Sequence, residues 1–178
     1  KWLASSALSD AEKAELEAIG GDRKEIEERF AKGLSFGTAG LRGVMKTGWN
    51  AMNVHTVAHA TQGLANLILS ENRAADGVAI AYDCRNNSAE FARTAARVLA
   101  ANGIRVYLFD ALRPTPELSF ALREMHCVAG INITASHNPK QYNGYKAYWD
   151  DGAQLPPEHA EAVSAEIAKL DIFADVKF

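Results

Sequence analysis

The chain has few cysteines, no long apolar run and no excess of basic charge. Its two cysteines, Cys84 and Cys127, lie far apart and outside any C-x-x-C pattern, which favours free thiols over a disulfide framework. No run approaches the roughly 18 apolar residues of a membrane span, and the first residues lack the apolar centre of a signal peptide. These absences predict a cytoplasmic protein with no membrane partner.

The charge balance is slightly acidic. The 178 residues include 19 Lys and Arg and 22 Asp and Glu, which gives a formal net charge of -3. Such a chain has no strong basic field to recruit nucleic acid, so we expect no nucleic-acid partner. Apolar residues make up 48% of the sequence, which is enough to bury a core of ordinary size. The composition therefore predicts an ordered globular protein.

The first 33 residues carry two helix signals. Ser9 with Glu12 forms a capping box, and Asp22 with Glu25 repeats the same spacing. These short helices have few apolar residues, so they cannot form a core of their own. We expect residues 1–33 to be a helical extension packed on a domain of residues 34–178.

Helical and strand patterns alternate along that domain. Apolar residues recur at helical spacing after Asn53, and short apolar runs follow between further helical stripes. The expected elements are a helix at 54–72, a strand at 78–82, a helix at 88–101, a strand at 104–109, a helix from 115, a strand at 127–134, a strand at 145–149 and a helix at 156–170. This order predicts an α/β fold, a three-layer α/β/α domain with a mainly parallel mixed sheet and helices on both faces.

Three loops follow the expected strands, at 83–88, at 110–116 and around Ser136. In an open α/β sheet, ligands gather beyond the carboxyl ends of the strands, because loops and helix N-termini converge there. Asp83 and Arg85 lie in the first loop, but a structural ion pair would explain them equally well. We therefore leave both residues out of the predicted catalytic set.

Ser136 allows more than one interpretation. Asn138-Pro139 favours a turn, so Ser136 could simply hydrogen-bond the backbone as it leaves the strand. Ser136 next to His137 also suggests a hydrolase, but no G-x-S-x-G motif is present and adjacent side chains in an extended chain point apart. Taken alone, the serine is best explained by the turn.

A glycine-rich loop at 36–43 contains Arg42, whose planar guanidinium fits phosphate oxygens. Three glycines let backbone N–H groups approach an anion, although the loop lacks the Lys-Ser/Thr of a nucleotide P-loop. Further along, Asn143-Gly144 is a turn signal that would bring Lys146 back toward Ser136. A solvated arginine and an edge-strand lysine remain the simpler alternatives for each residue alone.

Four segments, FGTAGLRG, YDCRNNS, RPTPELSFA and TASHNPKQYNGYK, occur in this order in one α/β chain. Together they resemble the first domain of the α-D-phosphohexomutases, the phosphoglucomutase and phosphomannomutase family, over roughly Leu34 to Leu155. The TASHNP hexapeptide with NGYK behind it is the most specific element. The N-terminal part is most similar to the branch of bacterial phosphoglucomutases and animal phosphoglucomutase/phosphopentomutases.

The resemblance implies an enzyme that interconverts glucose 1-phosphate and glucose 6-phosphate. Ser136 would carry a phosphoryl group, donate it to the phosphosugar substrate and take one back from glucose 1,6-bisphosphate. Mg²⁺ would bind an oxygen of the phosphate on Ser136. Other sugars of the same family, as in phosphomannomutase or phosphopentomutase, remain alternatives, and so does a non-catalytic sugar-phosphate-binding module.

The same resemblance implies roles for five further residues. Arg42 would lie beside the phosphoserine, and Lys146 would transfer a proton or stabilise charge near the sugar hydroxyl. His137 would be part of the catalytic set, while Thr38 and Asn138 would contact substrate or phosphate. These are expectations from the family pattern rather than from spacing or composition.

The family's other functional parts do not occur in this sequence. Its metal-binding D-G-D-x-D-R loop belongs to a second domain, and sugar and distal-phosphate recognition belong to a third and a fourth. Asp150 and Asp151 do not match that loop, so we do not assign the metal to them. We therefore expect a fragment of a four-domain enzyme that depends on the remaining domains of its parent chain and is inactive alone.

Overall fold

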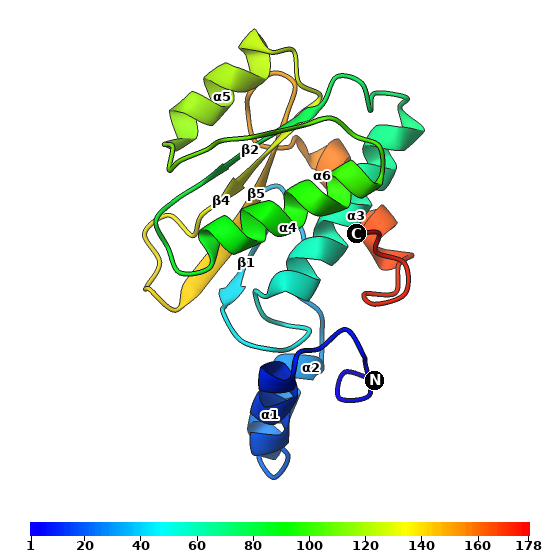
Figure 1. Cartoon of the computed structure of the whole chain (residues 1–178), viewed down its shortest axis with the longest axis vertical. Coiled ribbons are helices and arrows are strands. Elements are labelled where there is room, and N and C mark those ends of the chain that lie inside the picture. Colours follow the sequence, from blue (N-terminus) through cyan, green and yellow to red (C-terminus); the bar gives the residue numbers. More distant parts are fainter.

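The computed structural model describes residues Lys1 to Phe178 and contains a five-stranded sheet with helices on both faces (Figure 1). The strands are β1 (Leu41–Val44), β2 (Val78–Tyr82), β3 (Val106–Leu108), β4 (Ala129–Ile133) and β5 (Tyr142–Trp149). The helices are α1 (Asp10–Ala18), α2 (Arg23–Phe30), α3 (Val54–Ser70), α4 (Ser88–Ala101), α5 (Thr115–Glu124) and α6 (Pro157–Ala168). None of them combines the length and the apolar character that crossing a membrane requires.

The strand order in the sheet is β1-β5-β4-β2-β3. β2 runs parallel to both β3 and β4, whereas β5 runs antiparallel to β4 and to β1. The sheet is therefore mixed, and the predicted α/β fold is confirmed. Because β2, β3 and β4 are parallel, their carboxyl ends and the three loops that follow them meet at one edge of the sheet.

The two faces of the sheet differ in how they are covered. We call the face under α3, α4 and α6 the closed face; its core is a cluster of 26 buried residues. We call the other face, which carries only α5 over β2 and β4, the open face; its cluster has 6 buried residues. Figure 1 shows α5 alone on its side of the sheet. α5 also touches Tyr148 near the end of β5, whereas the part of the open face over β1 and the start of β5 has no helix on it.

Most predicted elements are confirmed, and two of them, β2 and α4, to the residue. Asn53 caps α3 as expected, since its side chain accepts hydrogen bonds from the amides of His55 and Thr56. β3 and β4 are shorter than the strands predicted at 104–109 and 127–134, while β5 starts three residues before the predicted 145. The short strand β1 has no counterpart among the predicted elements.

The prediction of a turn at Asn143-Gly144 is wrong, because both residues lie inside β5. The chain reverses earlier, where the Tyr142 amide donates to the Pro139 carbonyl at 3.0 Å. Asn143 is buried because its side chain links other segments: it donates to the carbonyl of Asn86 and to Ser88 Oγ. The expected return of Lys146 still occurs, through antiparallel pairing of β5 with β4.

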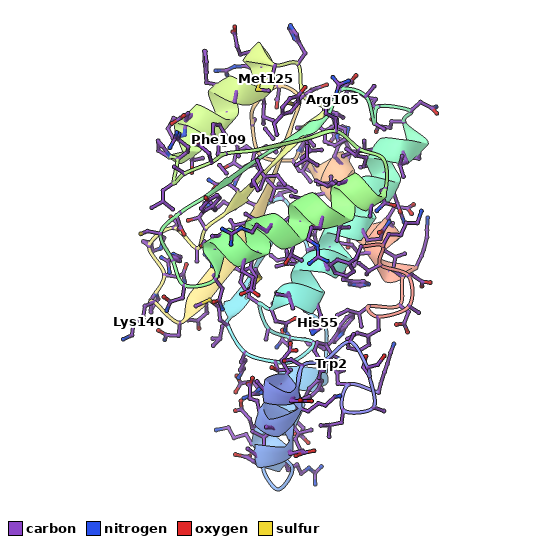
Figure 2. All side chains as sticks on the ribbon, in the orientation of Figure 1. Trp2, His55, Arg105, Phe109, Met125 and Lys140 are labelled. Carbon is purple, nitrogen blue, oxygen red and sulfur yellow. The ribbon has the colours of Figure 1, made fainter.

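The N-terminal helices pack against the body through a separate apolar cluster that includes Trp2, Leu16 and Ile172. Figure 2 shows Trp2 and His55 side by side at this junction, and their rings meet edge to face at 5.7 Å. Glu15 reaches Thr47 of the body at 2.6 Å. Burial acts to raise the pKa of Glu15, but hydrogen bonds from Thr47 and from an arginine outweigh it and hold the pKa below its ordinary value.

Candidate active site

Ser136 lies on the loop that follows β4, at the edge where the parallel strands end, and its side chain is exposed. Its φ of 56° is in the left-handed region, which non-glycine residues seldom adopt. The loop holds this conformation with local hydrogen bonds: the Ser136 amide donates to Thr134 Oγ1, and the Asn138 amide donates to the Ala135 carbonyl, both at 3.0 Å. The hydroxyl is therefore presented to solvent from an ordered turn.

His137 does not point away from Ser136, as an extended chain would require. Its Nδ1 lies 3.4 Å from Ser136 Oγ, because the left-handed conformation of Ser136 turns the two side chains to one side. The expectation that adjacent side chains point apart is wrong here. No further group orients the His137 ring and no strand-to-helix elbow carries Ser136, so the arrangement lacks the remaining parts of a hydrolase triad.

Arg42 reaches the Ser136 loop from β1. It pairs in register with Gly144 of β5, and its guanidinium donates to Asn138 Oδ1 at 3.1 Å. Gly144 is required by close approach, since a Cβ at this position would lie 2.6 Å from the Thr134 carbonyl oxygen. Two segments that are 96 residues apart in sequence thus meet here, and Arg42 contacts Asn138 two residues after Ser136.

Lys146 lies on the open face of β5, two residues after Gly144, and pairs in register with Asn132 of β4. It forms no ion pair with a carboxylate. Asn132 is a residue that the sequence did not single out: it is buried, its Nδ2 donates to Thr115 Oγ1 at 2.7 Å, and its Oδ1 has no hydrogen-bond partner. Lys146, which pairs with no carboxylate, and the unpaired Oδ1 of Asn132 therefore belong to neighbouring strands that lead to the Ser136 loop.

Two tyrosines of β5 stay protonated close to this point. Burial raises the pKa of the Tyr145 hydroxyl, which lies on the closed face and accepts a hydrogen bond from Thr61. Burial also raises the pKa of Tyr148, which lies against α5 on the open face. Neither phenol can therefore serve as a base near neutral pH.

The glycine-rich loop forms a tight hairpin with Thr38 and Ala39 at its tip. Gly37 and Gly40 exchange backbone hydrogen bonds, at 3.3 and 2.7 Å. Gly40 has a φ of 74°, and a Cβ there would lie 1.8 Å from the Tyr145 carbonyl oxygen, so only glycine fits. The hairpin therefore packs directly on β5 next to Lys146. The tip residue Thr38 is exposed, and its amide makes no hydrogen bond within the chain.

Arg85, which the sequence left ambiguous, contacts the Ser136 loop directly. Its two terminal nitrogens donate to four carbonyl oxygens, those of Ser136 and Asn138 at 2.7 Å, Pro139 at 3.1 Å and Tyr142 at 3.2 Å. The expected pair with Asp83 is present as well, at 3.4 Å. No local sequence pattern could have indicated these contacts, because the partners lie more than 50 residues further along the chain.

Positive charge exceeds negative charge around Ser136. Arg42 and Lys146 have no acidic partner, and Figure 2 shows Lys140 on the loop that joins β4 to β5. The nearest carboxylate, Asp83, is engaged by Arg85 and accepts a hydrogen bond from Ser88 at 2.7 Å. No group of three or more His, Cys, Asp or Glu side chains in the chain could hold a metal ion. The site therefore suits an anion.

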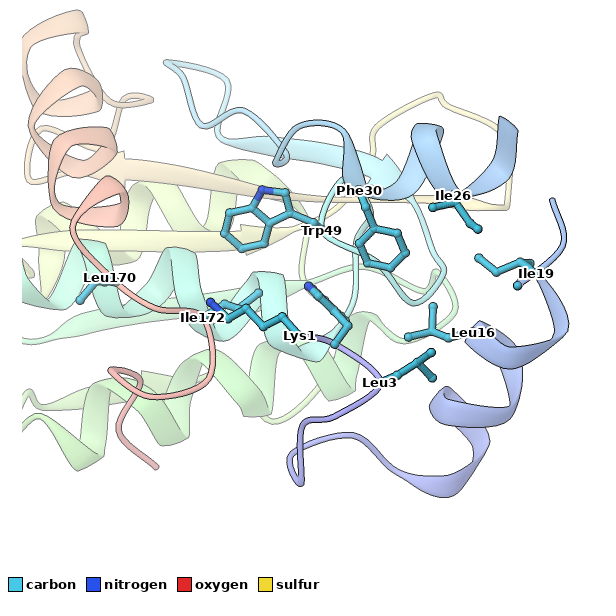
Figure 3. Close-up of a pocket in the computed structure, with 11 residues that line it drawn as sticks. Lys1, Leu3, Leu16, Ile19, Ile26, Phe30, Trp49, Leu170 and Ile172 are labelled. Carbon is cyan, nitrogen blue, oxygen red and sulfur yellow. The ribbon is translucent and has the colours of Figure 1, made fainter. Parts of the chain in front are cut away.

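Other candidate locations do not fit this chemistry. Asp150 lies at the opposite end of β5 and pairs with Arg73 at 2.8 Å, away from Ser136. A pocket of about 740 Å³ lies between the N-terminal helices and the body (Figure 3). Its lining is mainly apolar, with side chains such as Trp49 and Phe30, and its one charged side chain, Lys1, is paired with Asp171, so it is poorly suited to a phosphate. The Ser136 edge alone combines a reachable hydroxyl with unpaired cations.

An exposed serine beside unpaired cations, at the carboxyl edge of the parallel strands of an α/β sheet, is an arrangement suited to a phosphorylated ligand. The sequence from residue 33 to residue 172 matches the family described as phosphoglucomutase/phosphomannomutase, alpha/beta/alpha domain I. This match covers well over half of the chain. The chain belongs to the phosphoglucomutase/phosphomannomutase family and corresponds to its first α/β/α domain.

Individual relatives agree with this placement. A phosphoglucomutase of Staphylococcus epidermidis strain RP62A is 46% identical over 147 residues, which is 83% of this chain and 27% of that protein. A phosphoglucomutase of Staphylococcus aureus strain USA300 is 45% identical over 150 residues, with the same two shares. The chain thus spans about a quarter of the length of these curated relatives.

Solved structures show the same fold. One from Thermus thermophilus, assigned as a phosphomannomutase, superposes with a TM-score of 0.69 at 30% identity, over 83% of this chain and 31% of that one. The phosphoglucomutase pp63/parafusin of Paramecium gives a TM-score of 0.66 at 22% identity, over 82% of this chain and 27% of its own. At that lower identity the second likeness concerns the fold alone.

Proposed function

We propose that this chain is the phosphoserine-bearing part of a phosphosugar mutase that interconverts glucose 1-phosphate and glucose 6-phosphate. The observation that carries the proposal is Ser136: an exposed hydroxyl on an ordered turn, beside the unpaired cations Arg42 and Lys146. Phosphoryl transfer depends mainly on positioning and on positive charge around the equatorial oxygens, and this edge supplies both. The high identity to proteins named phosphoglucomutase favours glucose as the sugar.

The proposed cycle uses two transfers at the same serine. A hydroxyl of the sugar phosphate attacks the phosphorus of phosphoserine 136, so the bond between Oγ and phosphorus breaks and a sugar 1,6-bisphosphate forms. The second transfer reverses this chemistry: Ser136 Oγ attacks the other phosphoryl group and releases the isomeric monophosphate. In the first transfer the sugar hydroxyl gives up its proton and Ser136 Oγ leaves as a hydroxyl; in the second, Ser136 Oγ gives up that proton and the released sugar oxygen takes one. No phosphoryl group is consumed over a full turn.

The chain's own residues divide these tasks. Arg42 neutralises charge on the transferred phosphoryl group, and its contact with Asn138 keeps it beside the loop. Lys146 moves the proton of the sugar hydroxyl or stabilises the charge that develops on that oxygen. The free amide at the hairpin tip and the hydroxyl of Thr38 bind substrate phosphate. His137, at 3.4 Å from Ser136 Oγ, hydrogen-bonds the oxygen that leaves and returns.

Mg²⁺ is part of this proposal, but the chain does not contain a complete site for it. A phosphate on Ser136 would supply one oxygen ligand, and Mg²⁺ favours such oxygen ligands. The nearby carboxylate of Asp83 is already engaged, and no cluster of suitable side chains exists. We propose that the remaining ligands come from a further domain of the natural protein, and that the metal stabilises charge on the transferring phosphoryl group.

The proposal also extends to the organisation of the natural protein and to its compartment. Residues 1–33 form the helical extension of the first domain, and the substrate's sugar and distal phosphate are held by domains outside the matched residues. Free Cys84 and Cys127 suit a reducing compartment, which supports action in the cytoplasm. Phosphomannomutase or phosphopentomutase activity remains an alternative for the sugar, because no residue described above contacts a sugar ring.

The function is tested with the purified full-length natural protein. Glucose 1-phosphate, with Mg²⁺ and catalytic glucose 1,6-bisphosphate, should yield glucose 6-phosphate in an assay coupled to its oxidation. Mannose 1-phosphate and ribose 1-phosphate in parallel assays decide the sugar. Residues 1–178 alone should have no activity. If the full-length protein binds the bisphosphate but converts none of the three sugars, the chain belongs to a non-catalytic sugar-phosphate-binding module.

A further inference from the structure

The Ser136 loop has little structure of its own between the ends of β4 and β5. Its backbone hydrogen bonds within the loop are few, and Ser136, His137, Pro139 and Lys140 are exposed. Three of its carbonyl groups, those of Ser136, Asn138 and Pro139, converge with the carbonyl of Tyr142 at the start of β5 on one guanidinium from another loop. Arg85 therefore adds to the few local hydrogen bonds that hold the conformation presenting Ser136 Oγ.

The hydrogen-bond donors of Arg85 are fully used by these contacts. A guanidinium offers five N–H groups in a fixed plane. Nη1 donates to two carbonyls and Nη2 donates to two others, while Nε faces Asp83 at 3.4 Å. No donor is left for a substrate phosphate. This separates Arg85 from Arg42, whose only protein contact through the guanidinium is one bond to Asn138.

Asp83 and the residues around it fix the position of Arg85 in turn. Asp83 Oδ1 accepts hydrogen bonds from the Arg85 amide at 2.9 Å and from Ser88 Oγ at 2.7 Å. The buried side chain of Asn143, in β5, donates to Ser88 Oγ and to the carbonyl of Asn86, at 3.0 Å each. The loop after β2 is thus fixed to both the start of α4 and the middle of the sheet.

Resting on the proposed function, we propose that Arg85 is a positioning residue that holds the Ser136 loop in one conformation through both phosphoryl transfers. The serine must donate a phosphoryl group and then accept one at the same place, so its oxygen must not move between the two steps. Lysine cannot replace Arg85, because an ammonium group has three donors and no planar fork to reach four carbonyls. Arg85 does not touch the substrate.

The test compares Arg85→Lys with Arg113→Lys in the full-length natural protein. Arg113 is the matched control, an arginine of the neighbouring loop whose side chain contacts Asp110, Glu117, the Leu112 carbonyl and the Phe109 ring but not the Ser136 loop. Arg85→Lys should lower kcat by about 100-fold, the loss typical of a misplacement near 1 Å, while KM for glucose 1-phosphate stays within about threefold. Arg113→Lys should leave both values unchanged.

Hydrogen exchange tests, independently of activity, whether Arg85 restrains the Ser136 loop. Amides of a peptide covering residues 135–142 should exchange about tenfold faster in Arg85→Lys than in the wild type, because the loop opens more often. The same peptide should be unchanged in Arg113→Lys. Unchanged exchange together with an unchanged kcat would overturn the proposal. A raised KM at constant kcat would also overturn it, because Arg85 would then bind substrate.

A milder variant covers the case in which Arg85→Lys does not fold. Asp83→Asn keeps the guanidinium but removes its carboxylate partner, and it should give an intermediate rise in loop exchange and an intermediate fall in kcat. Wild-type exchange in Asp83→Asn would contradict the proposal that Arg85 restrains the loop. If the wild-type protein has no mutase activity but loop exchange responds as described, the proposed function fails and the restraint of the Ser136 loop by Arg85 is supported.

Discussion

The closed and open faces of the sheet show how one domain separates stability from chemistry. The closed face buries 26 core residues under three helices, whereas the open face buries 6 under α5 alone. α5 covers β2, β4 and Tyr148 near the end of β5, and it leaves the part of the face that carries Arg42 and Lys146 without a helix. An unpaired cation is costly in an apolar interior, so this gap is where such a cation can remain available for an anion.

The largest effect is expected on the closed face. Leu64 of α3 is fully buried, so Leu64→Ala should lower the free energy of unfolding by about 3 kcal/mol through lost packing and a residual cavity. Urea unfolding of the chain measures this. Leu69→Ala, in the same helix but 37% exposed, is the control and should cost much less. Equal losses for the two variants would remove the distinction between the faces.

Arg42→Ala tests the open face, and the effect should fall on the chemistry. Loss of one preorganised cation should reduce transition-state stabilisation in the full-length protein by about 2 to 4 kcal/mol, read from kcat/KM. The unfolding free energy should hardly change, because Arg42 is exposed and makes a single hydrogen bond. Near wild-type turnover would show that Arg42 is only a solvated surface residue.

Gly144→Ala should affect both properties, since Gly144 lies where the strands that carry the site approach most closely. An added Cβ would lie 2.6 Å from the Thr134 carbonyl oxygen and 3.0 Å from that of Leu41. The strands must shift, which should cost about 1 to 3 kcal/mol of stability and also lower mutase activity. Gly21→Ala, with open space around the new methyl group, is the control for the unfolding measurement.

The smallest effect concerns pH and the closed-face side chain His59. Burial lowers the pKa of its imidazole below the ordinary 6.5. The unfolded chain then binds more protons on acidification, so His59 contributes stability above pH 6.5 that is lost as pH falls through its folded pKa. Urea midpoints at pH 7.5 and 5.5 should differ less in His59→Gln than in the wild type. An unchanged difference would contradict this.

The sequence predicted the fold well where local patterns coincide with the tertiary structure. α4 and β2 have clear apolar periodicity and clear end signals, so their bounds were predictable to the residue. The turn predicted at Asn143-Gly144 is wrong for a physical reason. The Asn143 side chain hydrogen-bonds the Asn86 carbonyl, and Gly144 lies where two strands approach too closely for a side chain. β1 was hard to bound because four residues on an edge strand give almost no pattern.

The candidate site was predictable only in part. Ser136, Arg42 and Lys146 were found through the order of four segments, and the structure places them at one edge. Arg85 was left out of the predicted set and Asn132 was not singled out, since their contacts join segments distant in sequence. The left-handed backbone conformation of Ser136, which places His137 beside the hydroxyl, likewise has no signal in the sequence.

The most direct test of the central claim is the mass of the freshly purified full-length natural protein, with peptide mapping of any modification. After incubation with glucose 1,6-bisphosphate, one phosphoryl group should be present on the peptide that contains Ser136 and absent in Ser136→Ala. Exposure to glucose 1-phosphate should then remove that group. A protein that never gains phosphate at Ser136, while retaining its fold and binding the bisphosphate, would contradict the claim that this serine carries phosphorus.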